Sequence, residues 1–263
     1  MHPERFRYVE PFVGLGSVAY RVINTLPFRS FHLSDCFDWA YRYLMAVRGD
    51  LTDFGDIKDR LIELRRRFLP EHEYEYSIRL AFEDFKKPCR AGDYMAFGFL
   101  CNYAREQWVY PQRPDTAWFD PTNLGGGLAY MKVEKLLAWR QTLQRATIEQ
   151  RDAFEVLESL GPTDYGYCDP PYFGHGDKKD RMYAHEFFAD EHDRLRDILH
   201  NAKFPWMLSL NEHPLTWKYY LQSGKFHFVP VRYRTAPRRS STPKYFEWLI
   251  YNYDPRTGQL LNR

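Results

Sequence analysis

A chain of 263 residues is long enough for one large domain or two modest ones with a sizeable core. Its formal net charge of +2 is too small by itself to indicate a nucleic-acid binder, and no apolar run approaches the length of a membrane span. Four cysteines show no Cys-x-x-Cys spacing and follow no secretory signal, which predicts a reducing, cytoplasmic setting and no metal site.

The N-terminal part of the chain predicts a parallel sheet that starts strand, helix, strand, helix. The glycine turn Gly14-Leu15-Gly16-Ser17 lies between a strand at Arg7–Val13 and a helix that includes Val18–Ile23. A second strand, Phe31–Asp35, ends on an acid, and Asp38–Arg48 has the apolar spacing of an amphipathic helix. These elements form the first two strand–helix units of an α/β fold.

The pattern then changes in a way that predicts an inserted module. A charged helix is expected at Ile57–Phe68. From Glu71 to Ala129 the chain is aromatic, polar and broken by prolines and by Gly125-Gly126-Gly127. Helical spacing returns at Lys132–Thr147.

Strand–helix alternation resumes after this insertion. The expected elements, in chain order, are a short strand at Ala146–Glu149, a helix at Phe154–Leu160, a strand at Tyr165–Cys168, a helix at Asp190–Asn201 with Asp190 as its N-cap, a buried strand at Trp206–Leu210, and two strands at Phe226–Tyr233 and Tyr245–Tyr253. Short connections predict that the last two strands are antiparallel at a sheet edge. The segment Ala236–Pro243, rich in Ser, Pro and Arg, predicts a mobile loop.

The predicted domain organisation follows from these changes in pattern. A discontinuous catalytic domain is expected at residues 1–52 and 131–254, with a mostly helical insertion at 53–130 and a C-terminal tail at 255–263.

The motif Cys168-Asp169-Pro170-Pro171-Tyr172 is the most informative, because it ends a strand with two prolines. They remove two backbone donors and fix φ, and Pro170 pushes Asp169 out of the helical region. A carboxylate, a carbonyl and an aromatic face are thereby held at the edge where open α/β sheets bind ligands. This set suits a planar base with an amino group, whose two N–H groups need acceptors while Tyr172 stacks on the ring. A plain strand-ending turn is the alternative.

Three weaker signals are expected at the same edge. Phe12–Ser17 contains a partial G-x-G-x-x-G, with Ala19 in place of the third glycine, and glycines there let a backbone approach a ligand. Asp35 stands where a carboxylate can bind a ribose diol, and it would equally cap the next helix. Asp152-Ala153-Phe154, 17 residues before Asp169, would accept from an adenine amino group and pack on its ring. A first-turn acid and a core phenylalanine would look the same.

The order of these motifs resembles a Dam-type N6-adenine DNA methyltransferase of the D12 class, alpha group, from about residue 8 to about residue 254. The segments that carry the resemblance are Val9–Ser17, Leu33–Asp35, Arg151–Phe154 and Tyr167–Tyr172, and more loosely Trp206–Asn211, Arg238–Ser241 and Glu247–Tyr253. The resemblance implies a Rossmann-like, S-adenosyl-L-methionine-dependent methyltransferase sheet with an inserted target-recognition domain. It also implies a site-specific, adenine-specific DNA methyltransferase that acts in DNA modification, as in restriction-modification.

The resemblance also implies roles for individual residues. Residues Phe12 to Ser17 would line the methionine part of the cofactor, Asp35 the ribose, and Asp152 with Phe154 the adenine. The full implied cofactor set is Pro11, Phe12, Val13, Gly14, Gly16, Ser17, Asp35, Cys36, Asp152, Ala153, Phe154 and Asp169. The implied catalytic set is Asp169, Pro170, Pro171 and Tyr172. Asp169 and the Pro170 carbonyl would hold the N6 amino group of a flipped-out adenine, with no metal and no covalent enzyme intermediate.

Double-stranded DNA is the implied partner. Lys225 to Lys244 contains six basic residues and no acid, and with the insertion it would form the walls of a DNA cleft. Candidate DNA contacts are Arg90, Asn102, Tyr103, Arg105, Arg113, Arg234, Arg238, Arg239 and Lys244, because arginine and asparagine read base edges and basic groups bind phosphates. A surface ion pair is the alternative for each. Because Phe99–Arg105 only faintly matches the family's recognition hairpin, no GATC specificity is transferred.

Two other functions remain open at this point. An RNA methyltransferase acting on an exocyclic amine of ribosomal RNA shares the Asp-Pro-Pro-Tyr device, although motif order and insertion size favour DNA. The second alternative is a nucleic-acid-binding subunit that needs a partner chain for activity. It is motivated by a departure from the family, whose members begin with a further segment containing Gly-Gly-Lys, whereas only seven residues precede Tyr8 here. A partner subunit, a second copy or the C-terminal tail would then complete the cofactor pocket.

Overall fold

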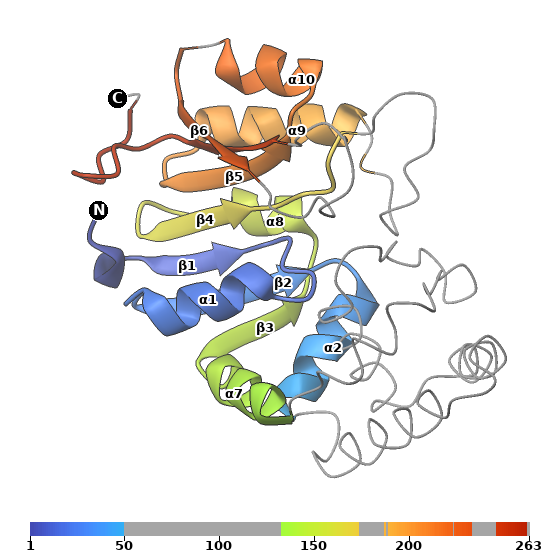
Figure 1. Cartoon of the computed structure of the whole chain (residues 1–263). Helices are drawn as coiled ribbons and strands as arrows, with labels where there is room; N and C mark the ends of the chain where they lie inside the picture. Colours follow the sequence, from blue (N-terminus) through green and yellow to red (C-terminus); the bar gives the residue numbers. More distant parts are fainter. Residues whose placement is uncertain (50–132, 174–186, 188, 223, 233–245, 262–263) are drawn as a thin grey trace, which may run out of the picture.

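A single seven-stranded sheet organises the molecule (Figure 1). The computed structural model describes residues 1–49, 133–173, 187, 189–222, 224–232 and 246–261. The strands are β1 (Arg7–Glu10), β2 (Ser30–Asp35), β3 (Ala146–Gln150), β4 (Asp164–Cys168), β5 (Trp206–Asn211), β6 (His227–Arg232) and β7 (Phe246–Tyr251), in the spatial order β3-β2-β1-β4-β5-β7-β6. Strands β1 to β5 are parallel, so their carboxyl ends share one edge. β7 pairs antiparallel with both β5 and β6.

Helices cover both faces of this sheet. They are η1 (Pro3–Arg5), α1 (Ser17–Thr25), α2 (Asp38–Arg48), α7 (Val133–Leu143), α8 (Ala153–Glu158), α9 (Ala189–Asn201), α10 (Pro214–Thr216) and the π-helical η2 (Trp217–Leu221). Figure 1 shows α1, α2 and α7 on one side of the sheet and α9 and α10 on the other.

Two hydrophobic cores result, one on each face. The first, called here the α1-side core, packs α1 and α2 on the sheet and includes Tyr8 and Leu44. The second, called here the α9-side core, packs α8, α9 and η2 on the opposite face and includes Leu195, Trp206 and Tyr220. Successive side chains of a strand point to opposite faces, so residues two positions apart lie on the same face. A strand residue that belongs to one core therefore shows which face the residues two positions away occupy.

The last described residues return to the sheet after β7. Tyr253 forms an isolated antiparallel bridge with Leu260, and the Leu261 N–H donates to the Asn252 carbonyl at 2.8 Å. The Met1 ammonium group donates to the Pro255 carbonyl at 2.8 Å. The two ends of the described chain are therefore side by side, as Figure 1 also shows.

The predicted α/β fold, with a parallel sheet and an antiparallel edge, is confirmed. The predicted helix at Lys132–Thr147 is wrong at its end, because α7 stops at Leu143 and Ala146–Gln150 forms β3 against β2. The first strand is shorter than predicted, since Pro11 follows Glu10 and has no N–H to donate.

Two further differences concern helices. Asp190 is not the N-cap of α9 but lies in its first turn, since the helix begins at Ala189. The short helices α10 and η2 were not predicted. The predicted insertion at residues 53–130 and the predicted loop at 236–243 lie outside the described residues.

Candidate functional site

Three carboxyl groups lie on one face of the sheet at its carboxyl edge. They are Glu10, Asp35 and Asp169. Each stands two residues after a member of the α1-side core on its own strand, namely Tyr8, Leu33 and Tyr167. Strand alternation therefore places all three on the α1 side of the sheet. Since β1 is the neighbour of both β2 and β4, the three groups belong to adjacent strands.

Two further strands extend this face. Met207 of β5 packs against the α1-side core, so Ser209 and Asn211 share its face by alternation. Glu247 of β7 pairs directly with Asn211 across the antiparallel ladder, and directly opposed residues lie on the same face. The carboxyl edge thus carries a continuous row of polar groups from β2 to β7.

The glycine turn after β1 is fastened to β2 through Asp35. The Val13 N–H donates to the Ser34 carbonyl at 3.0 Å, and the Gly14 N–H donates to the Asp35 Oδ2 at 2.8 Å. The other carboxylate oxygen of Asp35 accepts from the Phe37 N–H at 3.0 Å. Burial raises the pKa of Asp35, whereas these backbone hydrogen bonds lower it. Asp35 therefore holds the turn in place and ties it to the start of the following segment.

The two glycines of this turn differ in their surroundings. Gly14 has φ 50° and Gly16 has φ 75°, which is left-handed backbone that favours glycine. A Cβ added at Gly14 would meet no atom of the described residues within 4 Å, whereas one at Gly16 would meet the Trp139 ring at 3.2 Å. The turn is therefore packed at Gly16 and open at Gly14, where a ligand has room to approach.

Asp169 and Tyr172 are brought together by the proline turn, with Ser209 of β5 beside them. The Tyr172 and Ser209 hydroxyl oxygens are 3.1 Å apart. The pKa of Asp169 is raised to about 7, chiefly by burial and then by the charge of Glu247, against hydrogen bonds from Tyr172 and Ser209 that lower it. The residue keeps part of its surface open to solvent, although protein atoms surround its carboxyl group. Such a carboxyl can take up or release a proton near neutral pH.

Glu10 is the most deeply buried acid of this face, with 2% of its surface exposed. The Tyr8 hydroxyl donates to its Oε2 at 2.6 Å. The pKa of Glu10 is raised to about 8, first by burial, and the charges of Asp169 and Asp35 raise it further against the hydrogen bonds from Tyr8 and the Ala19 backbone. Glu10 and Asp169 titrate as an interacting pair, so near neutral pH they share fewer than two negative charges.

The Asp152–Phe154 motif lies at the carboxyl end of β3, and its side chains have structural partners. Asp152 is the N-cap of α8, because its Oδ1 accepts from the Phe154 N–H at 2.9 Å and from the Glu155 N–H at 3.2 Å. Phe154 is buried in the α9-side core, with the Arg194 guanidinium 4.5 Å from its ring centroid and Phe187 stacked at 5.8 Å. These are the structural roles weighed for this motif, and its contact with adenine stays a prediction.

The other predicted site residues are distributed as follows. Pro11, Val13, Ala153 and Pro170 are buried, Phe12 and Pro171 are half-buried, and Ser17 and Cys36 are exposed. The nine predicted DNA contacts, Arg90, Asn102, Tyr103, Arg105, Arg113, Arg234, Arg238, Arg239 and Lys244, all lie outside the described residues.

Four members of the polar row were not assigned a role from the sequence: Glu10, Ser209, Asn211 and Glu247. A signal for three of them was present. Glu10 is an acid at the end of an otherwise buried strand, and Ser209 and Asn211 interrupt the apolar run of β5. A polar residue in a strand buried on both faces needs a partner, which marks such positions as candidates.

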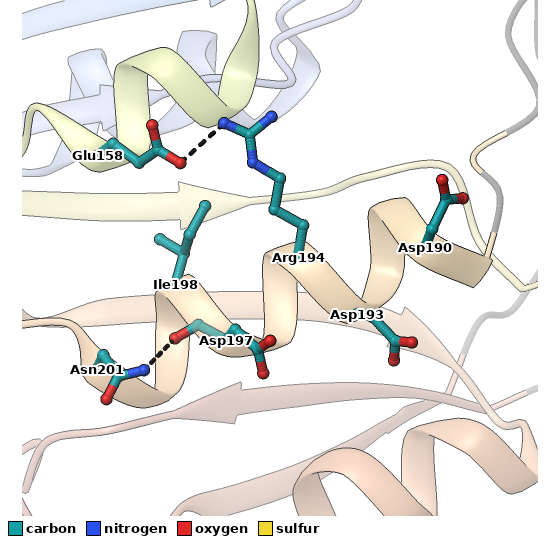
Figure 2. A pocket seen from close by; sticks show the side chains of 7 residues that line it. All are labelled: Glu158, Asp190, Asp193, Arg194, Asp197, Ile198 and Asn201. Carbon is teal, nitrogen blue, oxygen red and sulfur yellow. Dashed lines mark hydrogen bonds and ion pairs between the residues drawn. The ribbon is translucent and has the colours of Figure 1, made fainter.

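A separate groove is lined by residues of α8 and α9 (Figure 2). These helices pack on the face of the sheet opposite to Asp169. Figure 2 shows Arg194 of α9 reaching Glu158 of α8, and the two side chains pair at 2.8 Å. Asp190, Asp193 and Asp197 also line the groove. Its excess of carboxylates is unsuited to a phosphate backbone, so it is not a candidate nucleic-acid surface.

Metal and membrane sites were also sought in the part of the chain that the structure describes. There, no three His, Cys, Asp or Glu side chains are grouped so that they would hold a metal ion. No helix among these residues has the length and apolar character needed to cross a membrane.

The fold is a mostly parallel α/β sheet, the class in which ligands usually bind at the carboxyl edge, where this chain carries its polar row. The model of the D12 class N6 adenine-specific DNA methyltransferase family matches residues 2–236, and the chain belongs to this family. Its enzyme class is therefore that of the adenine-specific DNA methyltransferases.

Comparison with solved structures finds similar chains at low sequence identity. One is described as the delta-N METTL16 MTase domain, at 11% identity and TM-score 0.39, with 95% of this chain and 74% of that chain covered. Another is an rRNA methylase from Streptococcus thermophilus, at 7% identity and TM-score 0.32, with 93% of this chain and 86% of that chain covered. Comparison with curated protein sequences finds no match.

Proposed function

We propose that this chain transfers a methyl group from S-adenosyl-L-methionine to N6 of an adenine flipped out of double-stranded DNA. The proposal rests on one observation. Asp169, in its proline-fixed turn, lies on the same face of the sheet as Glu10 and Asp35, the acids that border the glycine turn. Membership of the D12 family agrees with it. One face of the sheet then serves both ligands, with the cofactor near β1 and β2 and the base near β4 and β5.

The residues present fit the proposed cofactor. When bound, S-adenosyl-L-methionine supplies a methyl group on a positively charged sulfur. Glu10, Asp35 and Asp169 lie on adjacent strands of one face, and buried like charges repel one another, so a cation beside them is favoured. The open space over Gly14 admits a ligand to this side of the turn. We expect Glu10, Gly14 and Asp35 to border the cofactor.

The proline turn suits the amino group of adenine. The N6 nitrogen is a weak nucleophile because its lone pair is delocalised into the ring, so the protein must position it. Asp169 would accept one N–H and the Pro170 carbonyl the other, while Tyr172 stacks on the base. The raised pKa of Asp169, about 7, suits a group that takes up the proton N6 loses. Entry of the base would exchange the hydrogen bond that Tyr172 makes to Asp169 for one from N6.

The basic residues that connect β6 to β7 in the sequence support a DNA substrate. Residues 233–245 connect β6 to β7, and at that end of the ladder Arg232 pairs with Phe246. The next residue of β7, Glu247, pairs with Asn211 at the carboxyl end of β5. Arg234, Arg238, Arg239 and Lys244 follow Arg232 and precede Phe246 in the sequence and lie outside the described residues, and we propose that they bind phosphates on either side of the flipped base.

The test is methyl transfer by the purified chain. Genomic DNA from cells without adenine methylation would be incubated with S-adenosyl-L-methionine, and the nucleosides quantified by mass spectrometry. We expect N6-methyl-2′-deoxyadenosine to accumulate. Total ribosomal RNA treated in the same way is the matched arm, and methylation of that RNA alone would overturn the DNA assignment.

A second experiment addresses the setting in which the enzyme acts. A DNA substrate in growing cells implies a cytoplasmic enzyme. Sequencing that detects modified adenines in cells expressing the chain should find them in one sequence context. The same cells expressing Asp169→Ala are the control and should show none.

A further inference from the structure

The proline turn contains few backbone donors of its own, yet it must hold a carboxylate and an aromatic ring in fixed positions. Pro170 and Pro171 have no N–H to donate. Side-chain hydrogen bonds reach the turn from β5, at positions two residues apart on one face of that strand. These come from Ser209 and Asn211.

We propose that Ser209 and Asn211 are positioning residues that hold the Asp169–Phe173 turn in the geometry required for methyl transfer. The proposal rests on the proposed function and deepens it. Ser209 acts on the reactive end of the turn and Asn211 on its far end. Neither residue needs to touch the substrate.

Ser209 lies next to Asp169 by strand register. Cys168 is the last residue of β4 paired with β5, opposite Leu208, so the following residues on both strands, Asp169 and Ser209, are neighbours. The Ser209 side chain is buried, with 3% exposed, and it makes hydrogen bonds with Asp169 and with the Tyr172 hydroxyl. A serine hydroxyl has one proton and two lone pairs. It can therefore donate to the carboxylate. The Tyr172 hydroxyl also has a single proton, which it donates either to Asp169 or to the Ser209 oxygen, but not to both at once.

This geometry gives Ser209 two effects on Asp169. A hydrogen bond to one carboxylate oxygen fixes the rotation of the carboxyl group, which leaves the other oxygen directed at the base. The Ser209 hydrogen bond also favours the ionised form of Asp169, because only the carboxylate has both oxygens free to accept hydrogen bonds. When Tyr172 releases Asp169 to stack on the base, the Ser209 hydrogen bond remains.

Asn211 fastens the far end of the turn. Its Nδ2 donates to the Phe173 carbonyl at 2.9 Å, and the orientation of the amide follows from chemistry, because a carbonyl can only accept. The Asn211 backbone carbonyl in turn accepts from the Thr216 hydroxyl at 3.0 Å. The Phe173 ring is packed between His192, at 3.7 Å, and His213, at 4.9 Å. The end of the turn is thus tied to β5 and to α9.

Activity provides the first test, with Ser209→Ala and Ser209→Thr. Loss of a hydrogen bond to a charged group predicts a fall in kcat of about 10- to 100-fold for Ser209→Ala, with S-adenosyl-L-methionine binding within about twofold of the wild type. The threonine variant keeps the hydroxyl and should recover most of the loss. Ser34→Ala is the matched control, since Ser34 is a buried serine whose hydroxyl has no hydrogen-bond partner within the described residues.

The pH dependence separates a positioning role from a structural one. Asp169 is faced by Glu10 of β1, Glu247 of β7, Ser209 of β5 and, in its own segment, Cys168 and Tyr172. Removing the Ser209 hydroxyl removes a hydrogen bond that lowers the pKa of Asp169. The rising limb of kcat/KM should therefore move to higher pH in Ser209→Ala and not in Ser34→Ala. A lower kcat with an unmoved limb would assign Ser209 a structural role and overturn the proposal.

A double-mutant cycle tests the Ser209–Asp169 contact without catalysis. Urea unfolding of the wild type, Ser209→Ala, Asp169→Ala and the double variant would be compared at pH 5.5 and 8.5. We expect the midpoint lost on Ser209→Ala to be larger at pH 8.5, where Asp169 is ionised, and to be independent of pH in the Asp169→Ala background. Equal losses in both backgrounds would overturn the contact. A chain that shows the coupling but methylates neither DNA nor RNA would refute the proposed function instead.

Asn211 is tested by Asn211→Asp and Asn211→Ala. Aspartate has nearly the same shape but no donor for the Phe173 carbonyl, so it removes the hydrogen bond with little change in packing. Both variants should lower kcat more than they raise KM, because a misplaced turn weakens the transition state rather than substrate binding. A kcat within twofold of the wild type in the aspartate variant, with normal folding, would remove Asn211 from the proposal.

Discussion

At the scale of single residues, Asp169 and Asp35 have the same charge but different partners. The Asp169 carboxyl group makes hydrogen bonds with Tyr172 and Ser209, whereas Asp35 accepts from the backbone N–H groups of Gly14 and Phe37. Asp169→Ala should therefore reduce methyl transfer at least 100-fold and, at pH 6, where Asp169 is mostly protonated, leave cofactor binding nearly unchanged. Asp35→Ala should weaken cofactor binding first, because the Gly14 N–H loses its acceptor. Calorimetric titration with S-adenosyl-L-methionine and initial rates of methyl transfer measure the two effects separately.

The outcome for Asp169 is decisive. A variant without the carboxylate that kept a tenth of the wild-type rate would show that N6 is positioned by other groups. For Asp35, unchanged cofactor affinity would mean that the glycine turn keeps its shape without this acid, and the pairing with the Gly14 N–H would then be a structural bond only.

The second residue-scale prediction concerns the charge of the Glu10–Asp169 pair. Burial raises the pKa of Glu10 to about 8 and that of Asp169 to about 7, so both lose protons as the pH rises from 6 to 8.5. A cation binds better to the ionised pair. The affinity for S-adenosyl-L-methionine should therefore rise across this window, by up to about tenfold per pH unit for each proton released.

S-adenosylhomocysteine provides the control for that prediction, because it lacks the positive charge on sulfur. Its affinity should rise less over the same pH range, and Glu10→Gln should flatten the curve for S-adenosyl-L-methionine. Equal slopes for the two ligands would mean that the carboxyl pair does not sense the sulfonium charge.

At the scale of elements, the glycine turn between β1 and α1 allows a matched pair of substitutions. Both Gly14 and Gly16 have positive φ, so alanine costs roughly 1–2 kcal/mol of backbone strain at either position. At Gly16 the new Cβ would also meet the Trp139 ring at 3.2 Å and Leu44 at 3.3 Å. Gly16→Ala should therefore lower the free energy of unfolding by more than Gly14→Ala. Urea denaturation measures the difference.

Ligand binding should rank the same two variants in the opposite sense. Gly14→Ala places a methyl group in the open space beside the proposed cofactor, so it should weaken S-adenosyl-L-methionine binding more per unit of stability lost. If Gly14→Ala bound the cofactor as the wild type does, the space over Gly14 would not belong to the cofactor site.

The elements also indicate how far sequence patterns reach. The glycine turn, the acid that ends β2 and the proline turn after β4 are local signals, and local signals sufficed to predict a parallel sheet with an antiparallel edge. The end of α7 was wrong because Ala146–Gln150 becomes a strand only by pairing with β2, more than a hundred residues away in sequence. A short strand at residues 146–149 was predicted from its own sequence, but helical spacing was extended over its first residues, and the pairing with β2 decides between the two.

The site was predicted unevenly for a related reason. Asp169 and Tyr172 stand in a motif whose prolines have a direct steric meaning. Ser209 and Asn211 contribute through strand register, which fixes which residues of β5 face Asp169 and which face the α9-side core. A one-residue slip would reverse that choice, so the partners of Asp169 could be assigned only once the pairing of β4 with β5 was known.

At the scale of the whole molecule, the three-layer packing, with helices on both faces of the sheet, explains why the acids of the site are buried. Helices α1 and α2 cover one face of the sheet, and α8, α9 and η2 cover the other. Glu10 is in the central strand of the parallel part, with β2 and β4 as its neighbours. An acid at this position is removed from water by the fold as a whole, and no single contact accounts for its raised pKa.

The burial of Glu10 predicts how the stability of the molecule depends on pH. The pKa of this carboxyl group is about 8 in the folded chain, against 4.5 as its ordinary value. Between these values the folded state keeps a proton that the unfolded state has lost, so the contribution of Glu10 to stability falls as the pH rises. Glutamine stays neutral and can still accept from the Tyr8 hydroxyl. The difference in free energy of unfolding between Glu10→Gln and the wild type should therefore shift in favour of the variant between pH 4.5 and 8, by at most about 1.4 kcal/mol per pH unit, and then level off. Thermal or urea unfolding at half-unit pH intervals measures this difference. A difference that stays constant across the window would mean that Glu10 is ionised in the folded chain, and that its charge is already balanced inside the sheet.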